Sequence, residues 1–142
     1  MYQSITVIGR LGRDPEMRYL PNGDPVTSFN VATDRVYNDR SGQKVSETTW
    51  FRVSVFGKSA ENANQFLSKG KMVLVEGRLR VDPKSGGPST YTRQDGTVGA
   101  SFELIANTVR FLSPKSEGGP GPVSEGVADE GVPSGGGEDI PF

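Results

Sequence analysis

Hydrophobic and polar residues alternate with period two along most of the first 112 residues. This alternation is typical of β-strands that bury one face and expose the other. It predicts a first strand whose extended course continues through residues 16–20, and four further strands. The predicted strands span residues 4–12, 26–33, 48–58, 71–81 and 100–112.

One segment, residues 59–69, has helical spacing instead. Its apolar residues form a stripe along one face, Ser59 can cap the N-terminus, and Lys69 followed by Gly70 favours a C-terminus there. The apolar stripe consists of Ala60, Ala63, Phe66 and Leu67. We therefore expect one helix, placed between the third and the fourth strand.

Three connections carry strong turn or loop signals. Residues 21–25 (PNGDP) interrupt the chain, residues 34–44 favour a long hairpin loop, and residues 82–98 favour a long mobile loop with Tyr91 in its middle. Five strands with one helix between strands 3 and 4 favour an all-β fold, a Greek-key barrel of the OB type. In such barrels one outer face and its loops bind nucleic acid.

The composition changes abruptly after Leu112. Residues 113–137 are rich in Gly, Pro, Ser and Glu, a composition typical of a disordered linker. Residues 138–142 (EDIPF) then combine two acids with two large apolar side chains. We expect a domain over residues 1–112, the linker, and an acidic tip that fits a basic pocket with an apolar floor on a partner protein.

The segment from Thr48 to Lys58 carries the clearest functional pattern. Alternation places Phe51, Val53 and Val55 on a core face, and it places four residues on the other face. These four are Trp50, Arg52, Ser54 and Phe56. Two rings with a guanidinium between them make a poor core face, because a buried Arg52 would need a partner. They suit single-stranded nucleic acid, whose unpaired bases can stack on the rings while the cation contacts the phosphates.

Charge and composition narrow the function classes. The chain through Ser113 is net basic and the remainder is net acidic, although the total is only −1. There is no Cys and no His, which leaves no thiol nucleophile, no disulfide and none of the usual zinc ligands. We expect no cofactor and no metal.

No signal peptide or membrane-spanning stretch is evident, so we expect a cytoplasmic, nucleoid-associated protein.

With these features in place, the chain closely resembles the bacterial single-stranded DNA-binding protein (SSB) family. The resemblance covers residues 5–112 and the last four residues, in family order. It rests on VIGRLGRDPE at 7–16, RY at 18–19 with PNG at 21–23, WFRV at 50–53, FGK at 56–58, KG at 69–70, VEGRL at 75–79 and DIPF at 139–142.

The resemblance implies roles for individual residues. Trp50 and Phe56 would stack on bases, and Arg52 and Lys58 would meet phosphates. Tyr37 falls where many members have an aromatic residue. A Trp that some members carry after the fourth strand is missing here, and Tyr91 is a candidate substitute. Further candidate backbone contacts are Arg10, Arg13, Arg18, Lys69, Arg78 and Arg80; of these, Arg78 and Arg80 share a strand face with Glu76, which could neutralise one of them.

At the level of assembly and function, the resemblance implies a homotetramer of OB domains. It also implies sequence-independent protection of single-stranded DNA and recruitment of replication, recombination and repair proteins by Asp139, Ile140, Pro141 and Phe142.

Alternatives from the same and from other classes remain open. An OB module for single-stranded RNA would show the same rings, because stacking does not sense the sugar. The run from Ile8 to Gly12 has the spacing of a KH-domain GXXG loop, but such a loop joins two helices. A nuclease would need clustered carboxylates, for which Asp14 with Glu16, or Asp34 with Asp39, are weak candidates. A pure interaction scaffold would bind no nucleic acid.

Overall fold

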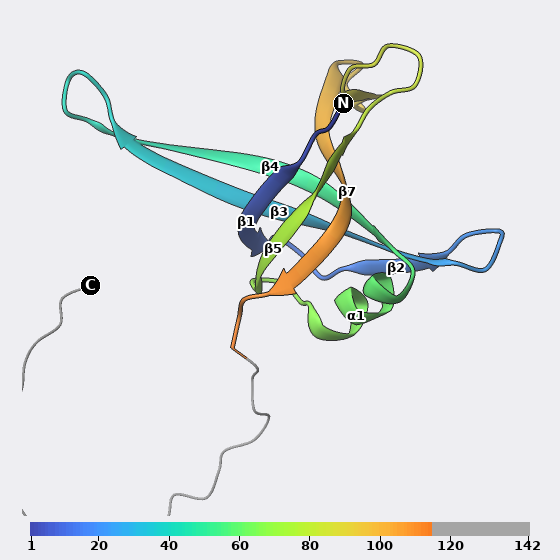
Figure 1. The fold of residues 1–142 in the computed structure, drawn as a ribbon. Helices are drawn as coiled ribbons and strands as arrows, with labels where there is room; N and C mark the ends of the chain where they lie inside the picture. The colour runs from blue at the N-terminus through green and yellow to red at the C-terminus, as the bar shows by residue number, and fades with distance from the viewer. Residues whose placement is uncertain (115–142) are drawn as a thin grey trace, which may run out of the picture.

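Residues 1–114 are described by the computed structural model, which shows a small β-barrel with one helix at its end (Figure 1). The expected linker from residue 115 onward and the tip, residues 138–142, lie outside the described residues. The elements are β1 Ile5–Leu11, β2 Glu16–Tyr19, β3 Pro25–Asn38, β4 Lys44–Phe56, α1 Lys58–Phe66, β5 Met72–Arg80, β6 Ser89–Thr92 and β7 Val98–Phe111.

Five strands close the barrel in the order β1, β5, β7, β4, β3, and β3 pairs again with β1. All pairings within residues 1–114 are antiparallel except β4 with β7. Near its end, β1 passes from β5 to β3 at Gly9, where a Cβ atom would lie 2.1 Å from the Ala32 carbonyl oxygen. The predicted five-stranded OB barrel, with the helix between its third and fourth strands, is confirmed.

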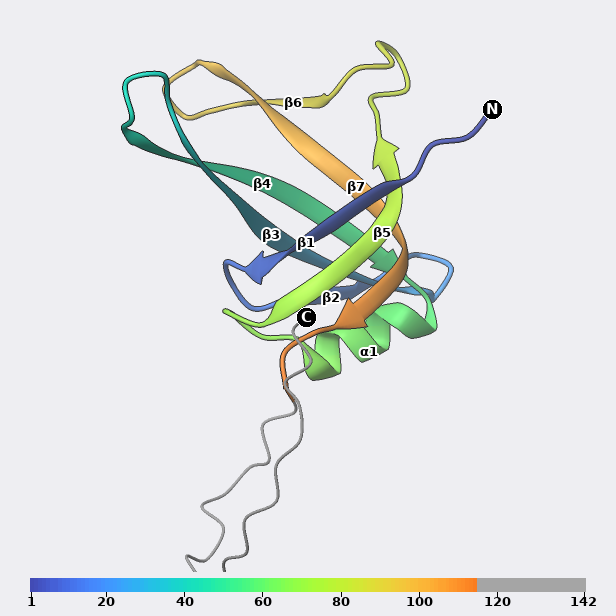
Figure 2. The same cartoon turned by 60° about the vertical axis from the view of Figure 1, so that its left-hand side comes forward.

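The core is filled by the inward residues of the barrel strands and by one face of α1, which lies below one end of the barrel (Figure 2). Thr27 on β3 attaches the helix, because its buried hydroxyl donates a 2.6 Å hydrogen bond to the Ala60 carbonyl. The core residues are Val7, Leu11, Phe29, Val31, Val53, Val55, Ala60, Ala63, Leu67, Val73, Val75 and Leu104.

Two predicted loops are partly strand. The hairpin loop expected over residues 34–44 is shorter, because β3 runs to Asn38 and β4 begins at Lys44. Residues 34–48 form a two-stranded arm that projects from the barrel (Figure 1). The loop expected over residues 82–98 contains β6, which forms a hairpin with β7 around Asp95-Gly96. That dipeptide is a strong hairpin signal, because Gly96 supplies the positive φ of the turn.

The helix boundaries also differ from the prediction. Gly57, not Ser59, is the N-cap, with φ 68°, and no side chain caps the first turn. The helix ends at Phe66, and Phe66 is half exposed instead of buried. At the end of β7, Ser113 is still fixed to the barrel, since its hydroxyl accepts a 2.7 Å hydrogen bond from the Met72 amide. No helix within residues 1–114 is long and apolar enough to cross a membrane.

Candidate nucleic-acid interface

The two faces of β4 are divided as the alternation predicts. Val53 and Val55 are fully buried in the barrel, whereas Trp50 is 51% exposed and Phe56 is 43% exposed on the outer face. Arg52, between the two rings, is also exposed. Ser54 is the exception to the predicted division, because it is buried. The outer face of β4 therefore presents two aromatic rings and a cation to solvent.

Trp50 borders a surface hollow of about 440 Å³. β4, β7, β6, β3 and the loop after β1 all contribute to the hollow, which is lined by Arg13, Asn30, Thr48, Thr49, Trp50, Phe51, Arg52, Tyr91, Ala100, Ser101 and Phe102. On one side the Trp50 ring lies against Gly12, where a Cβ atom would lie only 2.5 Å from the ring. We call this site the Trp50 hollow.

Tyr91, which the sequence placed in a mobile loop, lies on β6 and lines the same hollow. Its ring lies over Gly99 of β7, where a Cβ atom would come within 2.6 Å of it. The Arg93 guanidinium lies 5.5 Å from the ring centroid. The β6–β7 hairpin thus brings Tyr91 to the site of Trp50, although the two residues are far apart in the sequence.

Phe102 is a ring that the sequence reasoning missed. It is 57% exposed, lines the Trp50 hollow, and its ring centroid lies 5.9 Å from that of Phe51. The alternation in β7 gives Phe102 the same phase as the buried Leu104, so the pattern alone predicts a core residue. One feature of the sequence could have identified it. Phe102 lies near the start of its strand, where an inward-facing residue can lie beyond the end of the barrel and stay exposed.

Phe56 lies apart from the Trp50 hollow. It is six residues along β4, roughly 20 Å for an extended strand. The strand register places Val26 of β3 opposite Phe56 and Arg18 of β2 opposite Val26. Phe56 and Arg18 therefore form a second, separate region of the outer surface.

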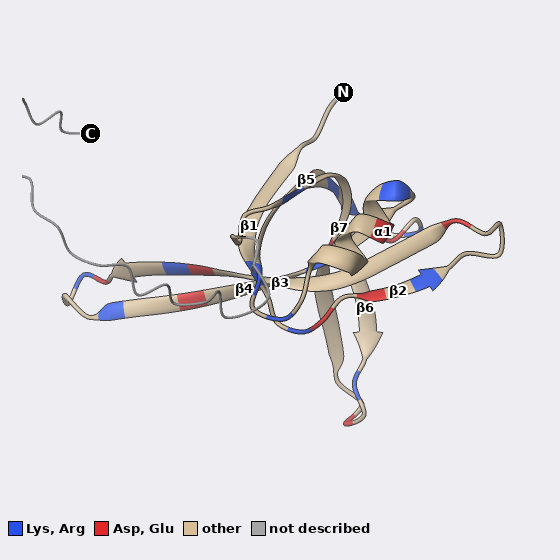
Figure 3. Cartoon of the chain, turned by 90° about the horizontal axis from the view of Figure 1, so that it is seen from below, with Lys and Arg blue, Asp and Glu red and all other residues tan. Residues whose placement is uncertain are grey.

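Tyr37 lies on the projecting arm, and the structure does not bring it to Trp50. The Arg35 guanidinium covers one ring face at 4.7 Å from the centroid, and the hydroxyl donates a 3.1 Å hydrogen bond to Glu47. That hydrogen bond, together with the carboxylate charge, raises the pKa of the Tyr37 phenol. The arm carries both signs of charge in alternation (Figure 3). One face of the Tyr37 ring stays uncovered by Arg35.

The predicted cations fall into two groups. Arg13 and Arg52 line the Trp50 hollow and take part in no ion pair within residues 1–114. Arg18, Lys69 and Arg78 do not line the hollow, but they too take part in no ion pair within these residues. Others already have partners.

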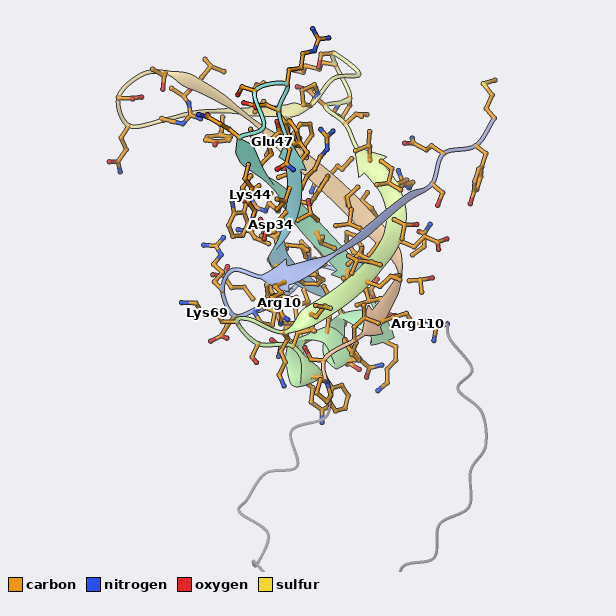
Figure 4. The ribbon with its side chains drawn as sticks, turned by 90° about the vertical axis from the view of Figure 1, so that its left-hand side faces the viewer. Arg10, Asp34, Lys44, Glu47, Lys69 and Arg110 are labelled. Atoms are coloured by element: carbon orange, nitrogen blue, oxygen red, sulfur yellow. The ribbon has the colours of Figure 1, made fainter. Side chains whose placement is uncertain are left out.

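Lys58 pairs with Glu61 at 3.1 Å, and its role as a phosphate contact beside Arg52 stays a prediction. Arg80 pairs with Glu103 at 3.7 Å, not with Glu76. Arg10 donates a 3.0 Å hydrogen bond to the Gly70 carbonyl, on the side of the barrel where Lys69 also lies (Figure 4).

The comparisons with known proteins decide the family. The model of the single-strand binding protein family matches residues 2–112. The chain belongs to this family.

Two curated relatives illustrate the membership, and both are single-stranded DNA-binding proteins. The protein of Neisseria meningitidis is 41% identical over 123 residues, which cover 86% of this chain and 67% of that protein. The protein of Thermotoga maritima is 40% identical over 114 residues, which cover 80% of this chain and 76% of that protein.

Among solved structures, the Plasmodium falciparum SSB in complex with single-stranded DNA is similar, with a TM-score of 0.63 and 26% identity. The match covers 80% of this chain and 96% of that one.

Three of the four carboxylates considered for a nuclease, Asp14, Asp34 and Asp39, have structural roles in this SSB-family chain. Asp14 accepts a 2.8 Å hydrogen bond from the Lys69 amide, Asp34 accepts one from Thr48, and Asp39 closes the turn of the arm by accepting from Ser41 and Gln43. Among residues 1–114, no three acidic side chains gather in a way that could hold a metal ion.

Proposed function

We propose that this chain is a non-catalytic protein that binds single-stranded DNA without sequence preference and protects it. The observation that carries the proposal is the Trp50 hollow in a member of the single-strand binding protein family. Exposed aromatic rings meet there with two arginines that take part in no ion pair within residues 1–114. Bases can stack on Trp50 and Tyr91 while Arg13 and Arg52 meet phosphates. Stacking of this kind tolerates every base, because each base has a π-face.

Beyond the hollow, we propose that the strand continues along β4 to Phe56. Arg18 is near enough in the strand register to meet a phosphate there. Lys58 stays a proposed phosphate contact beside Arg52. Further proposed contacts are Tyr37, Arg10, Lys69, Arg78 and Arg80.

Competition binding tests this function. A fluorescently labelled dT oligomer is bound to the full chain, and unlabelled oligomers of other bases, matched rU oligomers and duplex DNA are added. The proposal predicts that single-stranded DNA of any base composition displaces the label and that duplex does not. Tighter binding of rU than of dT would favour the RNA-binding alternative, and equal competition by duplex would contradict the proposal.

We also propose that the chain forms a homotetramer and that Asp139, Ile140, Pro141 and Phe142 recruit replication, recombination and repair proteins. The support is the sequence of the tip and the family membership. Association with nucleoid DNA in the cytoplasm would follow. Light scattering should give the mass of four chains of 15.2 kDa. Phe142→Ala should keep the affinity for dT oligomers and lose proteins that the unaltered chain retains from a cell extract.

A further inference from the structure

Phe102 is an exposed ring in a position where the strand pattern predicts a core residue. In the parallel register of β4 and β7, Phe102 lies beside Phe51, and the next inward pair is Val53 with Leu104. That next pair is fully buried. Phe102 therefore continues the core face beyond the end of the barrel, where no element within residues 1–114 covers it.

The surroundings of Phe102 contain more than apolar surface. Trp50 and Tyr91 line the same hollow of about 440 Å³, and the polar side chains of Thr48 and Ser101 line it as well. A hollow of this size lies within the range of small-ligand sites, about 300–1,000 Å³. Three exposed aromatic rings, from three different strands, thus border one concave site.

Two features keep the rings in place. Trp50 lies against Gly12 and Tyr91 lies against Gly99, so each ring rests on backbone that carries no Cβ. Phe102 is held through its tilted contact with Phe51, at an interplanar angle of 43°.

The charges indicate which partner fits this site. Arg13 and Arg52 line the hollow, and neither takes part in an ion pair within residues 1–114. An apolar surface of another protein would leave these two guanidinium groups uncompensated on burial. A nucleotide offers a flat ring to Phe102 and a phosphate to the arginines.

We propose that Phe102 is a further base-stacking residue, which holds one nucleobase of a single strand in the Trp50 hollow that Trp50 and Tyr91 also line. This inference rests on the proposed function. It adds a ring from β7 to the contacts that the resemblance assigns to β4. It also predicts that this nucleotide is held more firmly than those further along the strand.

The test compares four full-length variants by the anisotropy of a labelled dT oligomer, which needs no tryptophan signal. Phe102→Ala removes the ring, Phe102→Leu keeps an apolar side chain without a flat face, and Phe102→Tyr keeps the flat face. Phe111→Ala is the matched control, since Phe111 is a similarly exposed ring on the same strand that contacts Phe66 outside the Trp50 hollow.

The proposal predicts that Phe102→Ala and Phe102→Leu weaken binding roughly 5- to 150-fold, the effect expected for one stacked base. Phe102→Tyr and Phe111→Ala should bind as the unaltered chain does. A Leu variant that binds as tightly as the Tyr variant would overturn base stacking by Phe102.

A Trp50→Ala variant distinguishes failure of stacking by Phe102 from failure of the proposed function. If Trp50→Ala weakens binding while Phe102→Ala does not, Phe102 has no role in stacking and the proposed function stands. If neither variant weakens binding, the proposed function itself fails at this site. If Phe102→Ala lowers the mass measured by light scattering without changing affinity, Phe102 is a subunit contact and the proposal is overturned.

Discussion

The ring of Trp50 lies so close to Gly12 that a Cβ atom at position 12 would be 2.5 Å from Cζ3 and 2.6 Å from Cη2 of the indole. Real Cβ atoms essentially never come this close to another heavy atom. The absence of a side chain at position 12 therefore allows the indole to lie where it does. The loop after β1 thus positions a ring that belongs to β4.

Gly12→Ala is expected to rotate the Trp50 ring away from its present position. We predict weaker binding of dT oligomers, by up to about 1–3 kcal/mol, which is the contribution of one stacked base. The tryptophan emission of the unbound protein should also shift, because the surroundings of the indole change. Gly87→Ala is the control, since the nearest atom to its Cβ would be the Ser85 hydroxyl at 3.5 Å. Unchanged emission and affinity in Gly12→Ala would refute this positioning role.

Glu103 lies between two arginines in the sheet. The register pairs it with Arg52 of β4 on one side and with Arg80 of β5 on the other, and its carboxylate forms the ion pair with Arg80. Glu103→Gln removes the negative charge and keeps an oxygen that can accept from the Ser101 hydroxyl. Arg80 would then be available to a phosphate.

We therefore predict that Glu103→Gln binds single-stranded DNA more tightly at low salt, by roughly 0.2–1 kcal/mol, the range of an exposed ion pair. The slope of log affinity against log salt should steepen by about 0.7, the value for one added phosphate contact. Glu76→Gln controls for the general effect of losing one negative charge, since Glu76 takes part in no ion pair within residues 1–114. An identical gain in both variants would mean that the Arg80 pair has no part in the effect.

Tyr37 is separated from the Trp50 hollow along the arm. Ala32 lies opposite Trp50, and Tyr37 is five residues further along β3, roughly 17 Å. Tyr37→Ala should therefore weaken binding of a long dT oligomer of about 30 nucleotides and leave a short one of about 8 unaffected. Tyr37→Phe loses the hydrogen bond to Glu47 but keeps the ring, and it should bind both oligomers normally. Equal weakening of both oligomers by Tyr37→Ala would contradict a separate contact on the arm.

Thr27 joins the helix to the barrel through a buried hydrogen bond. Thr27→Val keeps the shape of the side chain and removes the hydroxyl that donates to Ala60. We expect a loss of about 1–2 kcal/mol in the free energy of unfolding, measured with urea. Thr33→Val is the control, because its hydroxyl makes a longer bond, 3.3 Å, to the Thr49 carbonyl in a less buried place. Equal stability of the two variants would show that the Thr27 bond is not important for attaching α1.

Local patterns predicted the barrel and the faces of β4 well. The alternation that places Trp50, Arg52 and Phe56 on the outer face depends on neighbouring residues alone. In the structure all three side chains are exposed, as predicted. The alternation in β7 places Phe102 on the core face with equal clarity, yet its side chain is exposed to solvent. Whether an inward position is covered depends on where the barrel ends, and that is set by the pairing of β7 with β4 and β5.

The missed ion pairs have two different causes. Lys58 and Glu61 are three residues apart on a helix, a spacing that favours an ion pair, so this pair was visible in the sequence. The pair of Arg80 with Glu103 joins β5 to β7, and its register depends on the bulge between Glu76 and Gly77. No local pattern carries that register. Tyr91 is similar, because it reaches Trp50 only through the β6–β7 hairpin.

The most direct test of the account is a tryptophan fluorescence titration of the full chain with oligo(dT) at low and high salt. Trp50 is the single tryptophan in the sequence, so the signal reports on one defined place. The account predicts strong quenching as a base stacks on the indole. The affinity should fall as salt rises, because phosphate contacts to Arg13 and Arg52 release counterions from the DNA and added salt opposes that release. Binding seen by anisotropy without any quenching would contradict it, because the strand would then pass elsewhere on the protein.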